Sequence, residues 1–136
     1  MAIKRIITSE DFAAEYPRVR AWLKESMKYQ IADDNEQNLL DDLVSRRLVL
    51  WVSDHAACVT EITSVDNVKV CLLYLVAGEH GKAMDEILDE GQSHLEAYAK
   101  SKGCKGFYGV GRPEWKRVLA PHGFKVQSVN FYKEFR

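Results

Sequence analysis

The second half of the chain, from residue 68 onward, carries the pattern that most constrains its fold. An apolar run over residues 70–76 leads into a glycine-containing loop at residues 78–83, and residues with helical spacing follow. Backbone N–H groups at a helix N-terminus attract anions, and pyrophosphate is a biological anion often bound in this way. The pattern therefore indicates a strand, a loop suited to phosphate and a helix.

A second strand and a shorter helix are expected after this long helix. Apolar residues recur with a helical period from Met84, and Gly103 stands where a helix C-terminus favours glycine. Residues 104–110 then have the composition of a strand, so the segment predicts a right-handed crossover between two parallel strands. Pro113 begins a short helix, and residues 124–135 are expected to form the final strand.

The first half of the chain predicts a short strand, two helices and an antiparallel meander. Residues 3–7 form the strand, and Thr8 is a suitable cap for the helix that follows. Pro17 divides this helical segment, because proline disfavours helical geometry in the residue before it. The inner side of the next helix is expected to consist of Leu39, Leu40, Leu43 and Val44. The meander is expected at residues 48–52, 56–62 and 68–76.

Composition argues against several classes of protein. At 136 residues the chain is expected to be one domain, 1–136, and its net charge of -1 predicts no general attraction to nucleic acid or to an anionic membrane. Its uncharged stretches are shorter than the roughly 20 residues of a membrane span, and its first apolar segment is too short for a secretion signal, so a cytoplasmic location is expected. The odd number and wide spacing of Cys58, Cys71 and Cys104 predict buried thiols, with no metal site and no disulfide framework.

The order of the predicted elements resembles that of the GCN5-related N-acetyltransferase (GNAT) family over nearly the whole chain. Gly123 and Phe124, between the short helix and the last strand, are similar to a Gly-Phe pair that recurs in this family at that point. The resemblance implies an α/β (α+β) fold with a mixed central sheet of about six strands. In this sheet an antiparallel meander would precede a parallel βαβ crossover, and helices would cover both faces.

The resemblance also implies a binding site for acetyl-CoA. Family members hold its pyrophosphate with a loop that begins with arginine or glutamine and continues x-x-Gly-x-Gly/Ala. Gly81 and Ala83 match this loop, whereas Gly78 stands at its first position. The alternative is a loop that merely connects a strand to a helix. The implied cofactor-binding residues are Leu75, Val76, Gly81, Lys82 and Ala83, with Arg112 after the next strand.

The candidate catalytic residues are Glu61 and Tyr108, because acetyl transfer to an amine benefits from a base for the amine and an acid for the departing thiolate. Partial burial in an apolar strand would raise the pKa of Glu61; the alternative is that Glu61 faces water or pairs with an arginine. Family members often use a tyrosine as the general acid at the position where this chain has Leu119. Tyr108 and Tyr132 are the substitutes nearby, and the alternative for both is a packing role.

A second motif, at residues 111–117, places a cation and a large aromatic residue at the end of the second parallel strand. Arg112 would bind phosphate or carboxylate through its guanidinium group, and Trp115 would form an apolar wall beside the cofactor. The alternative is an arginine at a sheet edge and a tryptophan in the core.

Two functions follow from these patterns. The first is an acetyl-CoA-dependent N-acyltransferase that transfers acetyl to an unidentified amine of a small molecule or a protein. The second rests on a looser resemblance of residues 60–62 and 111–119 to small bacteriophage-encoded proteins of the same fold. It implies an inactive GNAT-fold protein with a role in a virion, in assembly or in host interaction, located in the host cytoplasm or the virion. Its partner would be a phage protein or a second copy, and its contact patch would be Arg112, Trp115, Lys116 and Arg117.

Overall fold

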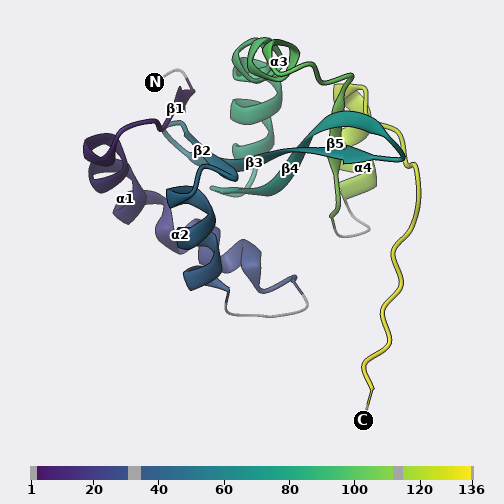
Figure 1. Ribbon diagram of the computed structural model, residues 1–136, viewed down its shortest axis with the longest axis horizontal. Coiled ribbons are helices and arrows are strands. Elements are labelled where there is room, and N and C mark those ends of the chain that lie inside the picture. Colours follow the sequence, from purple (N-terminus) through teal and green to yellow (C-terminus); the bar gives the residue numbers. More distant parts are fainter. Residues whose placement is uncertain (1–2, 31–34, 112–114, 136) are drawn as a thin grey trace.

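The computed structural model describes residues 3–30, 35–111 and 115–135, and its centre is a five-stranded mixed sheet (Figure 1). The strands lie side by side in sequence order, with antiparallel pairing from β1 to β4 and parallel pairing between β4 and β5. This arrangement confirms the predicted mixed sheet, with five strands among the described residues where about six were expected. The strands are β1 (Lys4–Arg5), β2 (Leu48–Val52), β3 (Ala56–Val65), β4 (Val68–Gly78) and β5 (Phe107–Gly109).

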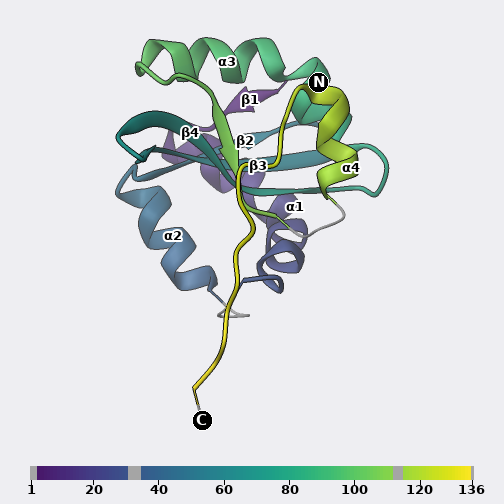
Figure 2. The same cartoon turned by 90° about the vertical axis from the view of Figure 1, so that its right-hand side faces the viewer.

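Helices cover both faces of the sheet, as predicted (Figure 2). One face packs against α1 (Ser9–Met27) and α2 (Glu36–Val44). The other face packs against a π-helix, η1 (Asp85–Glu90), and against α3 (Gln92–Ser101) and α4 (Trp115–Leu119), which a short 3-10 helix, η2 (Ala120–His122), extends. Within the described part of the chain, none of these helices has the length and apolar character needed to cross a membrane.

The first helix begins at its predicted cap but is not divided at Pro17. The Thr8 side chain accepts a hydrogen bond from the Asp11 N–H at 3.1 Å, and α1 then continues for 19 residues. The predicted break is therefore wrong. Pro17 lies on the exposed side of the helix, while Val19 and Leu23 on the inner side are fully buried against the sheet. Burial of this continuous stripe offsets the hydrogen bond that proline removes.

The inner face predicted for α2 is too wide. Leu39 is buried in the core, but Val44 is 79% exposed. Val44 is the last residue of the helix, and two residues later Arg46 takes a left-handed backbone conformation with φ of 70°. This reversal directs the chain into β2, so the final helical turn projects beyond the sheet.

The meander forms as predicted and includes a bulge in β4. Asp66 and Asn67 both have positive φ, as required by the two-residue turn that joins β3 to β4. In the pairing of these strands, Thr60 lies opposite Leu73 and Val59 opposite Leu75. Tyr74 is therefore an extra residue in β4, and such a bulge bends the strand locally.

The long helix predicted from Met84 has two parts. Over residues 85–90 it is a π-helix, in which the N–H of Gly91 donates to the Glu86 carbonyl oxygen, five residues earlier, at 2.9 Å. A β-carbon at position 91 would lie 2.8 Å from that oxygen, so the wide turn requires glycine. The expected continuous α-helical period is wrong here, although Ile87 and Leu95 are buried as predicted.

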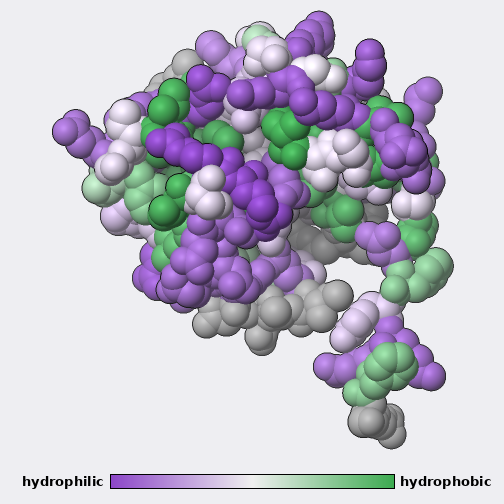
Figure 3. Space-filling model, in the orientation of Figure 1, coloured by the Kyte–Doolittle hydropathy of each residue, from purple (hydrophilic) through white to green (hydrophobic). Residues whose placement is uncertain are grey.

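The final strand predicted over residues 124–135 is wrong, because these residues have no regular secondary structure. The segment leaves the body of the protein, and hydrophobic and hydrophilic residues succeed one another along it (Figure 3). Beyond Phe124, which packs against the core, its apolar side chains are exposed, including Phe131 at 92% and Phe135 at 91%. An alternating pattern permits a strand, but a strand also needs a neighbour for its backbone hydrogen bonds.

The cysteines are free, and two are buried thiols as predicted. Cys58 and Cys71 are fully buried in the sheet, and Cys104 is half-buried. Burial raises the pKa of the Cys71 thiol to about 12, and it also raises that of Cys58. Both groups are therefore protonated at neutral pH and are poor nucleophiles.

Candidate functional site

The parallel strands β4 and β5 pair over three positions, and the pairing stops where β5 ends. Cys71 to Leu73 of β4 lie opposite Phe107 to Gly109 of β5. β4 continues to Gly78, so the ladder to β5 does not reach residues 74–78. The bulge at Tyr74 lies at the first position after this ladder ends. The predicted cofactor residues Leu75 and Val76 follow it and pair with β3 on their other side.

The loop after β4 begins at a position that excludes any side chain. Gly78 has a φ of 151°, and a β-carbon there would lie 2.3 Å from the carbonyl oxygen of His55. The next N–H, that of Glu79, donates to the same oxygen at 2.8 Å. The close approach of the β2–β3 turn therefore explains why this chain lacks the arginine or glutamine with which the acetyltransferase loop begins.

The predicted phosphate-binding amides differ in their availability. The N–H groups of Lys82 and Ala83 donate to the Glu79 carbonyl oxygen at 3.0 and 3.1 Å. The N–H of Gly81 has no acceptor among the described residues, and the space beside its α-carbon is open to 4 Å. A phosphate would therefore contact the Gly81 amide directly and would share the other two with the turn.

The charged groups around this loop sum to a net negative charge. The Lys82 ammonium lies 3.4 Å from the Glu79 carboxylate, and both side chains are about half exposed. Asp85 in the first turn of η1 is exposed as well. The loop thus offers an anion one open amide and a lysine that a carboxylate partly neutralises.

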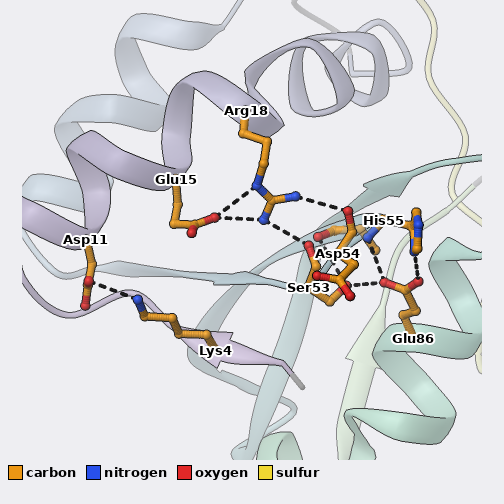
Figure 4. A network of polar contacts seen from close by, with 9 residues as sticks. Lys4, Asp11, Glu15, Arg18, Ser53, Asp54, His55 and Glu86 are labelled. Atoms are coloured by element: carbon orange, nitrogen blue, oxygen red, sulfur yellow. Dashed lines mark hydrogen bonds and ion pairs between the residues drawn. The ribbon is translucent and has the colours of Figure 1, made fainter. Parts of the chain in front are cut away.

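A polar network fixes the β2–β3 turn beside this loop (Figure 4). Glu86 of η1 accepts hydrogen bonds from the Ser53 hydroxyl at 2.5 Å and the His55 N–H at 2.9 Å, and it contacts His55 Nδ1 at 2.5 Å. On the other side, Arg18 of α1 donates to the carbonyl oxygens of Ser53 and Asp54 at 2.9 and 3.1 Å. Burial opposes ionisation of Glu86, but the hydrogen bonds from Ser53 and His55 outweigh it and lower its pKa.

This network was not predicted from the sequence. In the sequence, Glu86 is simply an acidic residue near the start of a helix, and His55 lies in the short connection between two predicted strands. Their contact joins residues 31 positions apart, so no local pattern identifies it. The network holds the turn whose carbonyl oxygen binds the start of the loop.

Glu61 and Tyr108 lie on one side of the sheet but do not meet. Both are register partners of Leu72, from β3 and β5 respectively, so they are separated by two strand spacings, roughly 10 Å. Glu61 forms an ion pair with Arg47, which also binds Asp42 at 2.5 Å. This pairing with an arginine is the alternative that the sequence left open for Glu61. Tyr108 is half-buried.

Trp115 lies against the end of β5. Its ring packs on Gly111, where a β-carbon would come within 2.9 Å of the ring. Trp115, Leu119 and Phe124 are partly buried against the core cluster that includes Val76. The tryptophan therefore packs at the margin of the core, beside the end of β5. Arg112, the other predicted residue of this motif, lies outside the described residues.

His122 joins the C-terminal helices to η1. Its Nδ1 lies 2.9 Å from a carboxylate oxygen of Asp89, and its side chain is largely buried. Asp85, Asp89 and His122 bring their ligand atoms within 4.8 Å of one another, which is close enough for a divalent cation. The contact between Asp89 and His122 links η2 to η1.

Comparison with solved structures identifies this arrangement. A probable acetyltransferase superposes with a TM-score of 0.68 and 14% identity, over 100% of this chain and 99% of that one. The chain has the GNAT fold. The aminoglycoside N-acetyltransferase AAC(6')-Iy in complex with CoA matches this fold with a TM-score of 0.66 and 12% identity, over 98% of both chains. Glucosamine-6-phosphate N-acetyltransferase from Arabidopsis thaliana matches with a TM-score of 0.62 and 14% identity, over 100% of both chains.

The similarity to GNAT-fold proteins is one of structure. No family model matches the sequence, and no curated protein matches it. At identities of 12 to 14%, these superpositions establish the fold and leave the chemistry to be argued from the site.

Proposed function

We propose that the protein is a CoA-dependent N-acyltransferase that acetylates an amine. The observation that carries this proposal is the end of the β4–β5 ladder just before the Tyr74 bulge, followed by a glycine loop that opens into a helix. Residues 74–78 of β4 thus have no pairing with β5, and the Gly81 amide lies in the loop that follows. Solved neighbours with the same fold include an acetyltransferase in complex with CoA, which supports CoA as the ligand.

The end of β4 and the loop would bind different parts of acetyl-CoA. The main chain of Leu75 and Val76 would hydrogen-bond the thioester and polarise its carbonyl. The Gly81 amide would bind the pyrophosphate, with the amides of Lys82 and Ala83 shared between phosphate and turn.

The reaction then needs two proton transfers. The amine nitrogen attacks the thioester carbon, the C–N bond forms and the C–S bond breaks. The attacking nitrogen loses a proton to Glu61, through a water molecule, and the departing thiolate gains a proton from Tyr108. The Arg47 guanidinium contacts the Glu61 carboxylate and would compete with the water molecule for it. The two groups are roughly 10 Å apart with Leu72 between them, so both substrates would lie across this residue.

Amino sugars are the first acceptors to test. The neighbours are named for aminoglycosides and for glucosamine 6-phosphate, and both are amines on a sugar ring. A panel of such amines, with a peptide amine for comparison, would identify the acceptor class.

A second candidate is a GNAT-fold protein without catalysis, including the phage-related interaction module inferred from the sequence. Two observations favour this alternative. Glu61 is already paired with Arg47, and two of the loop amides already donate to the Glu79 carbonyl oxygen. Trp115, Lys116 and Arg117, with Arg112, would then contact a protein partner.

Calorimetric titration with CoA tests the cofactor proposal directly. Lys82→Glu should weaken binding about tenfold, because it places a second carboxylate beside the phosphates, whereas Glu79→Gln should tighten binding by freeing Lys82. Lys100→Glu, an equal charge change at the far end of α3, serves as the matched control and should leave the affinity unchanged. Acetyl-CoA at a hundredfold excess over its Kd should stabilise the fold by about 2.7 kcal/mol.

Two results would decide between the candidates. Failure of CoA to bind or to stabilise the protein would contradict the enzyme proposal and leave the interaction module. If CoA binds, Glu61→Gln and Tyr108→Phe should each reduce kcat about a hundredfold for an accepted amine while CoA affinity is retained. Binding with unchanged turnover in both variants would contradict the assigned catalytic roles.

A further inference from the structure

The edge of the sheet farthest from β5 borders a pocket of about 440 Å³. β1 pairs with β2 at Lys4 and Arg5, the Ile6 N–H donates to the Leu50 carbonyl oxygen at 2.9 Å, and the chain then continues into α1. Residues 48–50 of β2 contribute to the lining of the pocket, with the start of α1 and the ends of α2 and α3 around it. We call this the β2-edge pocket. Its volume lies in the range typical of small-molecule sites, roughly 300–1,000 Å³.

Three cations from separate parts of the chain line the β2-edge pocket. They are Arg5 of β1, Arg46 after α2 and Lys102 at the end of α3. The lining includes no aspartate or glutamate, and none of the three forms an ion pair with a carboxylate in the part of the chain that the structure describes. The charged groups of Arg5 and Lys102 lie 5.0 and 5.8 Å from the Tyr98 ring centre. The pocket therefore concentrates positive charge.

The N-terminus of α1 adds to this field. Thr8, the cap residue of this helix, and Ser9, its first residue, both line the pocket. A helix of 19 residues has the positive end of its dipole at this point. The acidic residues of its first turn, Glu10 and Asp11, are not part of the lining, and Asp11 pairs with Lys4.

Arg46 occupies a backbone conformation that disfavours it. Its φ of 70° is left-handed, and the position just after a helix end usually has glycine or asparagine. The reversal into β2 thus has an arginine where glycine would be less strained, and this arginine lines the pocket.

The walls of the pocket are apolar. Phe12, Leu43 and Val49 contribute to them, and Val44 is exposed within the lining. We propose that the β2-edge pocket binds a small organic anion with an apolar body and a carboxylate or phosphate head. The head would contact Arg5, Arg46 and Lys102, and the body would cover the exposed apolar wall. This site lies at the opposite sheet edge from the proposed cofactor site and does not depend on it.

Titration of the 15N-labelled protein by NMR, with hexanoate, hexyl phosphate, hexanamide and inorganic phosphate as probes, tests the site. Hexanoate or hexyl phosphate should perturb the amides of residues 5–9 and 43–50, and the stronger of the two identifies the head group. Hexanamide has the same alkyl chain without a charge, and inorganic phosphate has the anionic group without an alkyl chain. Each should bind at least about tenfold more weakly. Raising the salt concentration should weaken hexanoate and hexyl phosphate but not hexanamide.

Variants at Arg46 separate binding from folding. Arg46→Gly should weaken the anionic probes about tenfold without lowering the melting temperature, because glycine suits the left-handed backbone. Arg46→Lys should keep the affinity within about threefold. Lys133→Gln, an equal charge loss in the exposed C-terminal segment, is the matched control. Equal binding of hexanamide, perturbations that map elsewhere, or an Arg46→Gly variant with unchanged affinity would overturn the proposal.

Discussion

The two faces of the sheet are packed to different degrees. On one face, α1 buries Leu23 and three further side chains along its 19 residues. On the other face, η1 and α3 bury Ile87 and Leu95, but α4 and η2 bury no residue fully. The second face also carries the π-helix and the positive-φ loop, whereas the first is covered by two α-helices.

This difference coincides with the proposed cofactor site, whereas the proposed base Glu61 lies on the face that α2 covers, where Arg47 joins it to Asp42. The loop, the π-helix and Trp115 are all on or beside the less tightly packed face. A site that admits a cofactor needs elements that move at little cost, and such elements come from the less stable parts of a fold. π-Helical turns are also frequent at functional sites. The tightly packed face would then hold the sheet in place while the other face adapts.

Matched leucine truncations give the largest expected difference between the faces. Leu23→Ala removes a fully buried side chain from α1 and should lower the free energy of unfolding by about 3–5 kcal/mol. Leu119→Ala removes a partly buried one from α4 and should cost about 1–2 kcal/mol. Urea unfolding measures both. Equal losses would show that α4 is packed as firmly as α1 and would remove the contrast.

The sequence predicted those parts of the fold that depend on local chemistry. The Thr8 cap, the turn at Asp66 and Asn67, and the glycine at position 103 each require a residue type that only a few side chains satisfy. Element order and fold class follow from such signals together with apolar periodicity. Pro17 is a local signal of the same kind, but the buried stripe of α1 overrides it.

The features that the sequence could not predict depend on contacts between distant segments. Nothing local shows that His55 lies against Gly78, or that Glu86 reaches back to the β2–β3 turn. The sequence left open whether Glu61 pairs with an arginine. Arg47 lies 14 positions away along the chain, so no local pattern identifies it as the partner. The roles of the candidate site residues therefore remain predictions, even though their positions in the fold are now known.

A carboxylate on the tightly packed face provides the next test. Arg20 and the Tyr16 hydroxyl bind Glu36, with Arg20 Nε at 2.6 Å and the hydroxyl at 2.8 Å. The Arg20 guanidinium lowers the pKa of Glu36 from 4.5 to about 2, against the opposing effect of burial. The folded-state pKa lies below the unfolded one, so this group stabilises the fold above about pH 4.5 and ceases to do so as the pH falls toward 2.

Glu36→Gln should therefore cost about 1 kcal/mol at pH 7, a modest value because Arg20 is half exposed. The cost should disappear in acid, where Glu36 becomes protonated in the folded protein. Between about pH 4.5 and 2, the free energy of unfolding of the variant should therefore fall less than that of the unmodified protein. Unfolding at a series of pH values measures it. Glu25→Gln, which removes an exposed ion pair at the end of α1, is the control and should leave the pH dependence of stability in acid unchanged. If the free energy of unfolding becomes less dependent on pH in both variants, the loss of one negative charge, and not the contact of Glu36 with α1, causes the change.

The smallest effect is expected in the C-terminal segment, beyond the less tightly packed face. Phe131 is 92% exposed, so Phe131→Ser should change the free energy of unfolding by no more than about 0.5 kcal/mol. Phe107→Ser, the same substitution at a half-buried position in β5, should cost about 2 kcal/mol. Urea unfolding at two protein concentrations measures both. A loss at Phe131 as large as that at Phe107 would mean that the segment pairs with another strand in solution, as its alternating sequence permits, because an unpaired aromatic ring in water contributes almost nothing to stability.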